Sequence, residues 1–253
     1  MAHRGALMLN VTARQELMRT IVETLGVVVE EARLDFGEDG LAVRVVDPSH
    51  VAMIKMDVDS AAFDTWEVDE TKLGLEMRKL KDIVGLAAAG DMVELAYNDE
   101  SGQATINIGR IDLNLRPLDN TTLNPPNVPS LELPCGVTIS GSDLAQALRA
   151  ARQVGDLVNL SLTDSKFSVN VKGSTDSVNV EFSKDELMAI DCNDAARSQY
   201  SLTYLIPLAK IFQGIENVNL RFGENFPLKI TFDFSDGAGH VEYFLAPRVE
   251  GDF

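Results

Sequence analysis

The residues that could do chemistry are few, and they do not cluster. The three histidines, His3, His50 and His240, are scattered, and no set of His, Cys and carboxylate residues has the short spacing of a zinc site. The chain contains no Gly-x-Ser-x-Gly elbow, no phosphate-binding Gly-Lys-Ser/Thr loop and no Gly-x-Gly-x-x-Gly fingerprint. Carboxylates are plentiful, but no pair is singled out for acid/base work. The sequence therefore predicts no enzyme, no metal site and no cofactor, and Gly237–His240 is best explained as a hairpin turn.

The two cysteines, Cys135 and Cys192, offer neither a disulfide framework nor metal-ligand spacing. We interpret them as two small core or surface residues of a protein from a reducing compartment. No apolar run approaches the ~18 residues of a membrane span, and the start of the chain is too short and polar for a signal peptide. We therefore expect no membrane contact.

Length and charge set the broad class. A chain of 253 residues suits two domains of ordinary size, and 45% hydrophobic residues are enough for a buried core. The formal net charge of −17 would ordinarily exclude nucleic acid as a ligand, because phosphates require local lysine and arginine. Net charge is a sum, however, so the placement of the 22 basic residues decides the question.

The hydrophobic pattern repeats four times as a strand, a short helix and three more strands. Helical spacing recurs in the ranges 13–29, 76–89, 144–154 and 205–212. This pattern predicts an α+β fold of two similar domains, each with antiparallel β-sheets that carry two helices on one face. The alternative is an ordinary two-domain α+β protein with accidental symmetry.

The sequence also predicts how three of these helices begin. Thr12 is a plausible N-cap of the first helix, and Ser142 with Asp143 would cap the third. Pro207 lacks a backbone N–H, so we expect it in the first turn of the fourth helix.

An extended connector, Leu115–Pro134, separates the two halves; we call it the strap. Its prolines, Pro125, Pro126, Pro129 and Pro134, disfavour both helix and sheet interiors. Leucines recur between the prolines, so the strap is expected to lie on a surface and to border a binding groove. We place the domains at 1–116 and 135–253, joined by the strap at 117–134.

Basic residues outside the apolar faces gather on the predicted helices. They are Arg14, Arg19, Arg78, Lys79, Lys81, Arg149, Arg152 and Lys210, whereas acidic residues concentrate in turns, strands and the C-terminus. For any single helix this is usually just a solvated face. The same sign on four repeated helices indicates a basic surface on an acidic protein.

Three segments resemble the proliferating cell nuclear antigen family of sliding clamps, most of all its archaeal members. They are Val43–Trp66 with its Asp47-x-Ser49-His50-Val51 sequence, the strap, and Tyr243–Val249. The resemblance covers about Met8 to Val249, and Met1–Leu7 looks like an extension that the family usually lacks. It implies a homotrimeric ring in which the sheets lie outside and the helices line a hole. Twelve helices at about 8–10 Å spacing would enclose a passage roughly 25 Å wide, enough for a DNA duplex.

The resemblance implies a non-catalytic DNA processivity factor that encircles double-stranded DNA without sequence preference. DNA polymerase, the clamp loader, flap endonuclease and DNA ligase would dock through short glutamine–aromatic motifs, called PIP boxes, in replication and repair. The implied location is the cytoplasmic nucleoid if the protein is archaeal, or the nucleus if it is eukaryotic. The alternative is a monomeric or heteromeric clamp-like scaffold of the checkpoint type.

The resemblance also assigns three sets of residues. The DNA-facing set is Arg14, Arg19, Lys79, Lys81, Arg149, Arg152 and Lys210. The partner-peptide pocket is Val46, His50, Val51, Leu123, Pro125, Pro227, Phe244, Ala246 and Pro247, with Pro125 where an aliphatic residue is common. The subunit interface would pair 105–113 with 174–182, through Ile108, Arg110, Ile111, Lys172, Asp176, Val178 and Val180.

Overall fold

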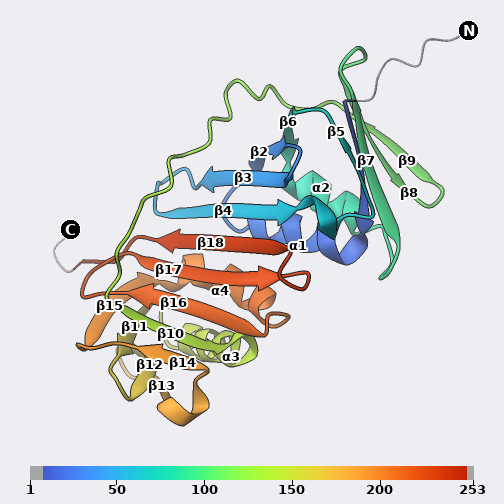
Figure 1. The fold of residues 1–253 in the computed structure, drawn as a ribbon. Coiled ribbons are helices and arrows are strands. Elements are labelled where there is room, and N and C mark those ends of the chain that lie inside the picture. Colours follow the sequence, from blue (N-terminus) through green and yellow to red (C-terminus); the bar gives the residue numbers. More distant parts are fainter. Residues whose placement is uncertain (1–7, 250–253) are drawn as a thin grey trace, which may run out of the picture. The chain divides into compact units, whose positions relative to one another are not determined.

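The computed structural model describes residues 8–249, so the predicted extension Met1–Leu7 lies outside the described residues. The chain divides into two compact units (Figure 1). The first unit comprises Met1–Val46, Ile54–Asn127 and Ser235–His240, and the second comprises Asp47–Met53, Val128–Phe234 and Val241–Phe253.

The first unit holds two antiparallel groups of strands and two helices. One sheet has the order β5-β1-β7-β8-β9, and another group has the order β4-β3-β2-β6. The strands are β1 (Leu9–Arg14), β2 (Glu31–Phe36), β3 (Gly40–Val46), β4 (Ala52–Asp59), β5 (Thr65–Val68), β6 (Thr71–Glu76), β7 (Met92–Asn98), β8 (Gln103–Ile108) and β9 (Ile111–Leu115). Helices α1 (Gln15–Leu25) and α2 (Met77–Val84) contact each other. A short 3₁₀ helix, Ser60–Ala62, follows β4.

The second unit repeats this plan. Its four-stranded sheet has the order β13-β12-β11-β15, and a further group has the order β14-β10-β16-β17-β18. The strands are β10 (Cys135–Ser140), β11 (Leu157–Leu162), β12 (Lys166–Lys172), β13 (Ser177–Ser183), β14 (Ala189–Asp191), β15 (Ala196–Ser201), β16 (Asn217–Phe222), β17 (Leu228–Phe234) and β18 (Gly239–Leu245). Helices α3 (Gly141–Arg152) and α4 (Leu202–Phe212) pair with each other, and a 3₁₀ helix spans Lys184–Glu186. The α+β architecture predicted from the hydrophobic repeat is confirmed.

Each helix is amphipathic and buries its apolar stripe. In α1 the buried side chains include Leu17, Ile21 and Leu25, which recur at helical spacing. Burial of this stripe fixes which side of each helix stays exposed. The basic side chains of the helices are therefore left facing solvent.

The helices begin in a way that local sequence does not indicate. The first N–H of each helix donates to a backbone carbonyl from a distant segment of the same unit: Gln15 to Asp91, Met77 to Glu30, Gly141 to Ile215 and Leu202 to Asp156. This contact recurs at all four helices, and it satisfies one of the N–H groups that a helix start leaves unpaired. The fourfold repeat thus extends to the hydrogen bonds that hold each helix to its sheet.

Two predicted caps are corrected by the structure. Thr12 lies within β1, where it pairs with Glu94 of β7, and α1 has no side-chain cap. The cap of α3 is Ser140, whose hydroxyl accepts a hydrogen bond from the Asp143 N–H at 3.3 Å. In both cases the strand runs directly into the helix, so the boundary lies nearer the strand than local propensity indicates.

Pro207 is inside α4, beyond its first turn, contrary to the prediction. A proline there deprives the carbonyl four residues earlier, that of Thr203, of its helical donor. Both Thr203 and Pro207 are exposed, so water can reach that carbonyl. The hairpin predicted at Gly237–His240 is confirmed by the turn between β17 and β18, where Ser235, Asp236 and Gly237 have positive φ.

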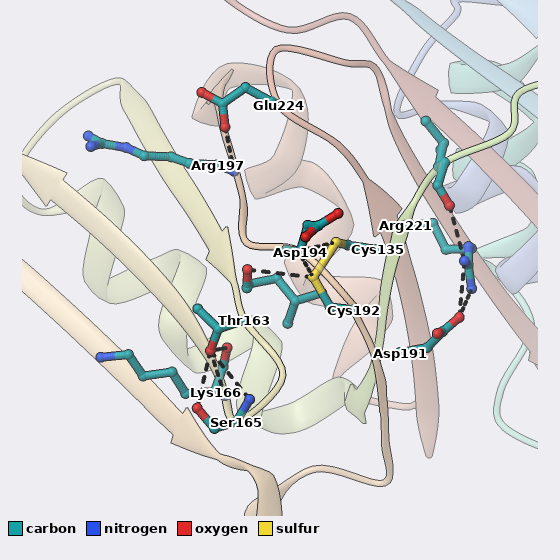
Figure 2. The surroundings of a disulfide bond; sticks show 12 residues. Cys135, Thr163, Ser165, Lys166, Asp191, Cys192, Asp194, Arg197, Arg221 and Glu224 are labelled. Atoms are coloured by element: carbon teal, nitrogen blue, oxygen red, sulfur yellow. Dashed lines mark hydrogen bonds and ion pairs between the residues drawn. A yellow bond between two sulfur atoms is a disulfide. The ribbon is translucent and has the colours of Figure 1, made fainter.

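The interpretation of the two cysteines as separate residues was wrong. Cys135 begins β10 and Cys192 follows β14, and the two form a disulfide (Figure 2). Their Cα atoms are 4.3 Å apart although 57 residues separate them in sequence. The pairing of β10 with β14 creates this proximity, which spacing along the chain does not reveal.

The strap is attached by hydrogen bonds at both ends. Leu118 N–H donates to the Gly74 carbonyl at 2.8 Å, and Asn120 donates to the Lys72 carbonyl at 2.8 Å, so the strap begins along β6. A Cβ on Gly74 would lie 2.9 Å from the Leu118 oxygen, which explains the glycine. In the second unit the Leu133 carbonyl accepts a hydrogen bond from Arg221 at 3.0 Å.

Candidate functional site

The loop Asp47–Val51, which we call the docking loop, is built around one buried carboxylate. Asp47 is 6% exposed, and its side-chain oxygens accept hydrogen bonds from the backbone N–H groups of Ser49 (2.9 Å), Val51 (2.6 Å) and Ala52 (2.6 Å). His50 has a positive φ of 56° and an exposed side chain. The carboxylate therefore holds the turn, and His50 is left free to present its imidazole to solvent.

Two tyrosines tie this loop to the rest of the second unit. The Tyr204 hydroxyl of α4 donates to the Asp47 carboxylate at 3.4 Å, and the Tyr243 hydroxyl of β18 donates to the Tyr204 carbonyl at 3.0 Å. Burial raises the pKa of Tyr243 well above its ordinary value, and the charges of Asp47 and Tyr204 add to this shift. Tyr243 therefore stays a neutral donor.

The segment Ala246–Val249, which we call the tail, is joined to the same loop. Ala246 N–H donates to the Val51 carbonyl at 2.9 Å. Just before the tail, Phe244 is 6% exposed, and the ammonium of Lys229 lies 5.5 Å from the centre of its ring. Lys229 also forms an ion pair with Glu242.

The predicted pocket residues divide between the two units. His50, Val51, Pro227, Phe244, Ala246 and Pro247 belong to the second unit, and Val46, Leu123 and Pro125 belong to the first. In the second unit His50 and Ala246 are exposed, Val51, Pro227 and Pro247 are half-buried, and Phe244 is buried. The hydrogen bond between Val51 and Ala246 brings the docking loop and the tail together. In the first unit Val46, Leu123 and Pro125 are each half-buried.

Asp47 and Tyr204 were missed by the sequence-based assignment of site residues. Asp47 carries a local signal, because an aspartate two residues before a serine in a turn commonly accepts its N–H. Tyr204 carries none, since 157 residues separate it from the carboxylate that it contacts.

All seven residues predicted to face DNA are exposed and lie on a helix or at its start. Arg14, Arg19, Lys79 and Lys81 belong to α1 and α2, and Arg149, Arg152 and Lys210 belong to α3 and α4. Some of their charge is compensated within the chain. Arg19 and Lys81 both approach Glu23, at 3.3 Å and 3.8 Å, and Arg152 pairs with Asp156.

Three of the seven predicted interface residues, Ile111, Val178 and Val180, lie on strands at a sheet edge. β9 and β13 are the outer strands of their sheets, and Ile111 on β9 is 37% exposed. Val178 and Val180 on β13 are half-buried, and Lys172 and Asp176 flank the preceding turn and are exposed, as is Arg110. Ile108 is different, because it ends the inner strand β8 and is only 4% exposed. Its partner across β8 and β9, Ile111, occupies the edge instead.

Glu181, on the same edge strand β13, already has a partner within the chain. Its carboxylate accepts a hydrogen bond from the Lys166 ammonium at 2.9 Å. This hydrogen bond is the main reason that the pKa of Glu181 is lowered, with further contributions from Asn179 and from the charge of Lys166.

Two features are absent from residues 8–249. No helix in that part of the chain is long and apolar enough to cross a membrane. No group of three or more His, Cys, Asp and Glu side chains there is arranged to hold a metal ion.

Comparison with known families matches almost the whole chain. Residues 8–112 match the model described as proliferating cell nuclear antigen, N-terminal domain, and residues 127–248 match the corresponding C-terminal domain. A Methanosarcina barkeri protein named DNA polymerase sliding clamp is 35% identical over 238 residues, covering 94% of this chain and 97% of the relative. A protein of the same name from Halobacterium salinarum is 34% identical over 240 residues, with coverage of 94% and 97%.

Solved structures agree on the fold. The structure described as the C-terminal region of FEN-1 bound to A. fulgidus PCNA has a TM-score of 0.91 at 30% identity, covering 97% of this chain and 100% of that one. PCNA from Thermococcus kodakaraensis has a TM-score of 0.87 at 21% identity, with coverage of 95% and 100%.

Proposed function

Because the chain belongs to the proliferating cell nuclear antigen family, we propose that it acts as a DNA sliding clamp. Three copies form a closed, non-catalytic ring around duplex DNA and tether replication and repair enzymes to it. Because its relatives include archaeal proteins, we propose that the chain works at the nucleoid in the cytoplasm.

One observation carries the DNA-binding part of the proposal. On a chain with a net charge of −17, the seven cations assigned to DNA are all exposed on α1–α4 or at their starts. A basic surface on an acidic protein attracts phosphate at that surface and repels it elsewhere. The attraction is weakened where Glu23 and Asp156 pair with these cations. Weak, sequence-independent attraction is what a sliding ring needs, because tight binding would slow its movement.

Partner docking is supported by the geometry of the second unit. The docking loop is fixed by Asp47, and the tail beside it is an extended segment with Phe244 at its base. A short peptide with aromatic anchors binds to apolar side chains, and Val51, Phe244 and Pro247 supply such side chains here. In one solved structure the C-terminal region of FEN-1 is bound to A. fulgidus PCNA. We propose that polymerase, clamp loader, flap endonuclease and ligase dock here through glutamine–aromatic motifs.

A charge-reversal experiment tests the DNA-facing assignment. Arg149→Glu combined with Arg152→Glu should lower the stimulation of a DNA polymerase on primed DNA several-fold, because acidic side chains would repel the phosphates. The matched control is Lys72→Glu combined with Lys184→Glu, which changes the net charge equally at exposed positions outside the four helices. Full stimulation by the Arg149/Arg152 variant, or equal loss in the control, contradicts the assignment.

A further inference from the structure

A polar cavity of about 330 Å³ lies beside β15 in the second unit, outside the predicted peptide pocket. Its walls include Asn159, Arg197 and Gln199 on the sheet, Glu224 and Asn225 on the loop after β16, and Arg248 of the tail. No function assigned so far uses these residues.

The walls of this cavity are held by hydrogen bonds on both sides. On one side Arg197 N–H donates to the Glu224 carboxylate at 3.2 Å, as Figure 2 shows, and Asn225 N–H donates back to the Arg197 carbonyl at 3.4 Å. The Tyr200 hydroxyl fixes the same loop through the Phe226 carbonyl at 2.7 Å. On the other side Arg248 N–H donates to the Gln199 carbonyl at 2.7 Å. The loop and the tail are therefore both anchored to β15.

The charged groups of the cavity favour an anion. Glu224 is the single carboxylate among the residues that line it, and this carboxylate already accepts the Arg197 backbone N–H. In Figure 2 the Arg197 guanidinium extends away from Glu224. Within residues 8–249 neither Arg197 nor Arg248 has an ion-pair partner. Two arginines without an ion-pair partner in that part of the chain thus line one cavity of a strongly acidic protein.

Two of the residues that line the cavity, Asn159 and Gln199, carry carboxamides. Asn179, Asn170 and Asn159 lie opposite one another across β13, β12 and β11, and Gln199 of β15 continues the row to the cavity. Carboxamide N–H groups and guanidinium groups together match the several acceptor positions of a carboxylate.

We propose that this cavity binds the carboxylate of an Asp or Glu side chain that flanks the docking motif of a partner peptide. Arg248 follows Pro247 of the predicted peptide pocket directly and lines the cavity, so the cavity adjoins the tail beside which the peptide would dock. The inference rests on the proposed docking function and deepens it, since it adds a charge preference to a site otherwise defined by aromatic anchors. Partners with acidic flanks are thereby favoured despite the net charge of the clamp.

The test compares three fluorescent peptides that share one glutamine–aromatic motif. One carries two aspartates before the motif, one carries them after it, and one has alanines on both sides. At low salt one acidic peptide should bind the wild-type protein about three- to tenfold more tightly than the alanine peptide, the range expected for a pair of partly exposed ion pairs. Arg197→Gln combined with Arg248→Gln should abolish this difference, so that all three peptides bind with equal affinity.

Lys72→Gln combined with Lys184→Gln removes the same charge elsewhere and should keep the difference. Equal binding of all three peptides to the wild type, or a preference that survives in the Arg197/Arg248 variant, overturns the anion site. Failure of every peptide to bind overturns the docking function itself, so the two failures are distinguishable.

Discussion

Among single residues, Asp47 holds the docking loop in its turn through hydrogen bonds. It is buried, accepts three backbone N–H groups and also receives the Tyr204 hydroxyl. A buried carboxylate in this position is stabilised by the hydrogen bonds it accepts, and each lost bond would leave an unpaired N–H at a cost of about 1–3 kcal/mol. The shape of the docking loop depends on this one residue.

Asp47→Ala should therefore lower the affinity for a glutamine–aromatic peptide by about tenfold or more, because the loop loses its fixed turn. Isothermal titration calorimetry measures the affinity. Asp59→Ala is the control, since Asp59 accepts the N–H of Ala61 two residues ahead in the same way but in an exposed turn of the first unit. Unchanged peptide affinity in Asp47→Ala, with the control also unchanged, would show that the loop does not contribute to docking.

Contacts between individual residues that are far apart in the chain were the hardest to predict from the sequence. The Asp47-x-Ser49-His50-Val51 pattern located the loop, but the partners Tyr204 and Tyr243 lie 157 or more positions away. The disulfide between Cys135 and Cys192 was missed for the same reason, because only strand pairing brings the two Cα atoms together. Hydrogen bonds and disulfides between distant segments depend on the finished fold.

At the scale of elements, the hydrophobic period was enough to find all four helices and to identify their buried faces. It did not locate their first residues, because each helix start is fixed by a carbonyl from a distant segment and three of the four have no side-chain cap. The position of Pro207 was also predicted wrongly. A proline inside α4 is tolerated because this part of the helix is exposed to water, which the sequence does not show.

We predict that neighbouring chains pair through the edge strands β9 and β13. An unpaired edge strand invites pairing with another chain, and pairing two such edges between neighbours would close a ring. Ile111→Asp places a charge on the edge of β9 and should reduce the molecular mass measured by light scattering from three chains towards one.

Leu86→Asp is the matched control for that experiment. Leu86 is a more exposed apolar residue, at 58% against 37% for Ile111, and it lies just after α2 rather than on an edge strand. Its mass should stay that of the wild type. Loss of assembly in both variants, or in neither, would contradict the role given to β9.

For the whole molecule, the important feature is that acidic and basic side chains lie on different parts of the chain. The chain is acidic overall, yet its four helices carry exposed cations. If three copies close around a duplex, the closed ring itself retains the DNA. The cations then need only offset the repulsion between the acidic protein and the DNA phosphates. The fold and the family were predictable from the repeat and the motifs, whereas the encircling of DNA is a property of the assembly.

A ring that holds DNA mechanically retains it only while the DNA ends are blocked, and a threading experiment measures this retention. Linear DNA biotinylated at both ends is incubated with the protein, its ends are blocked with streptavidin, and the salt is raised until direct phosphate attraction is screened. Protein should remain on the blocked DNA, be released when a restriction enzyme frees one end, and be lost from DNA that was never blocked. Equal retention with and without blocked ends, or complete loss from both at high salt, would contradict the account.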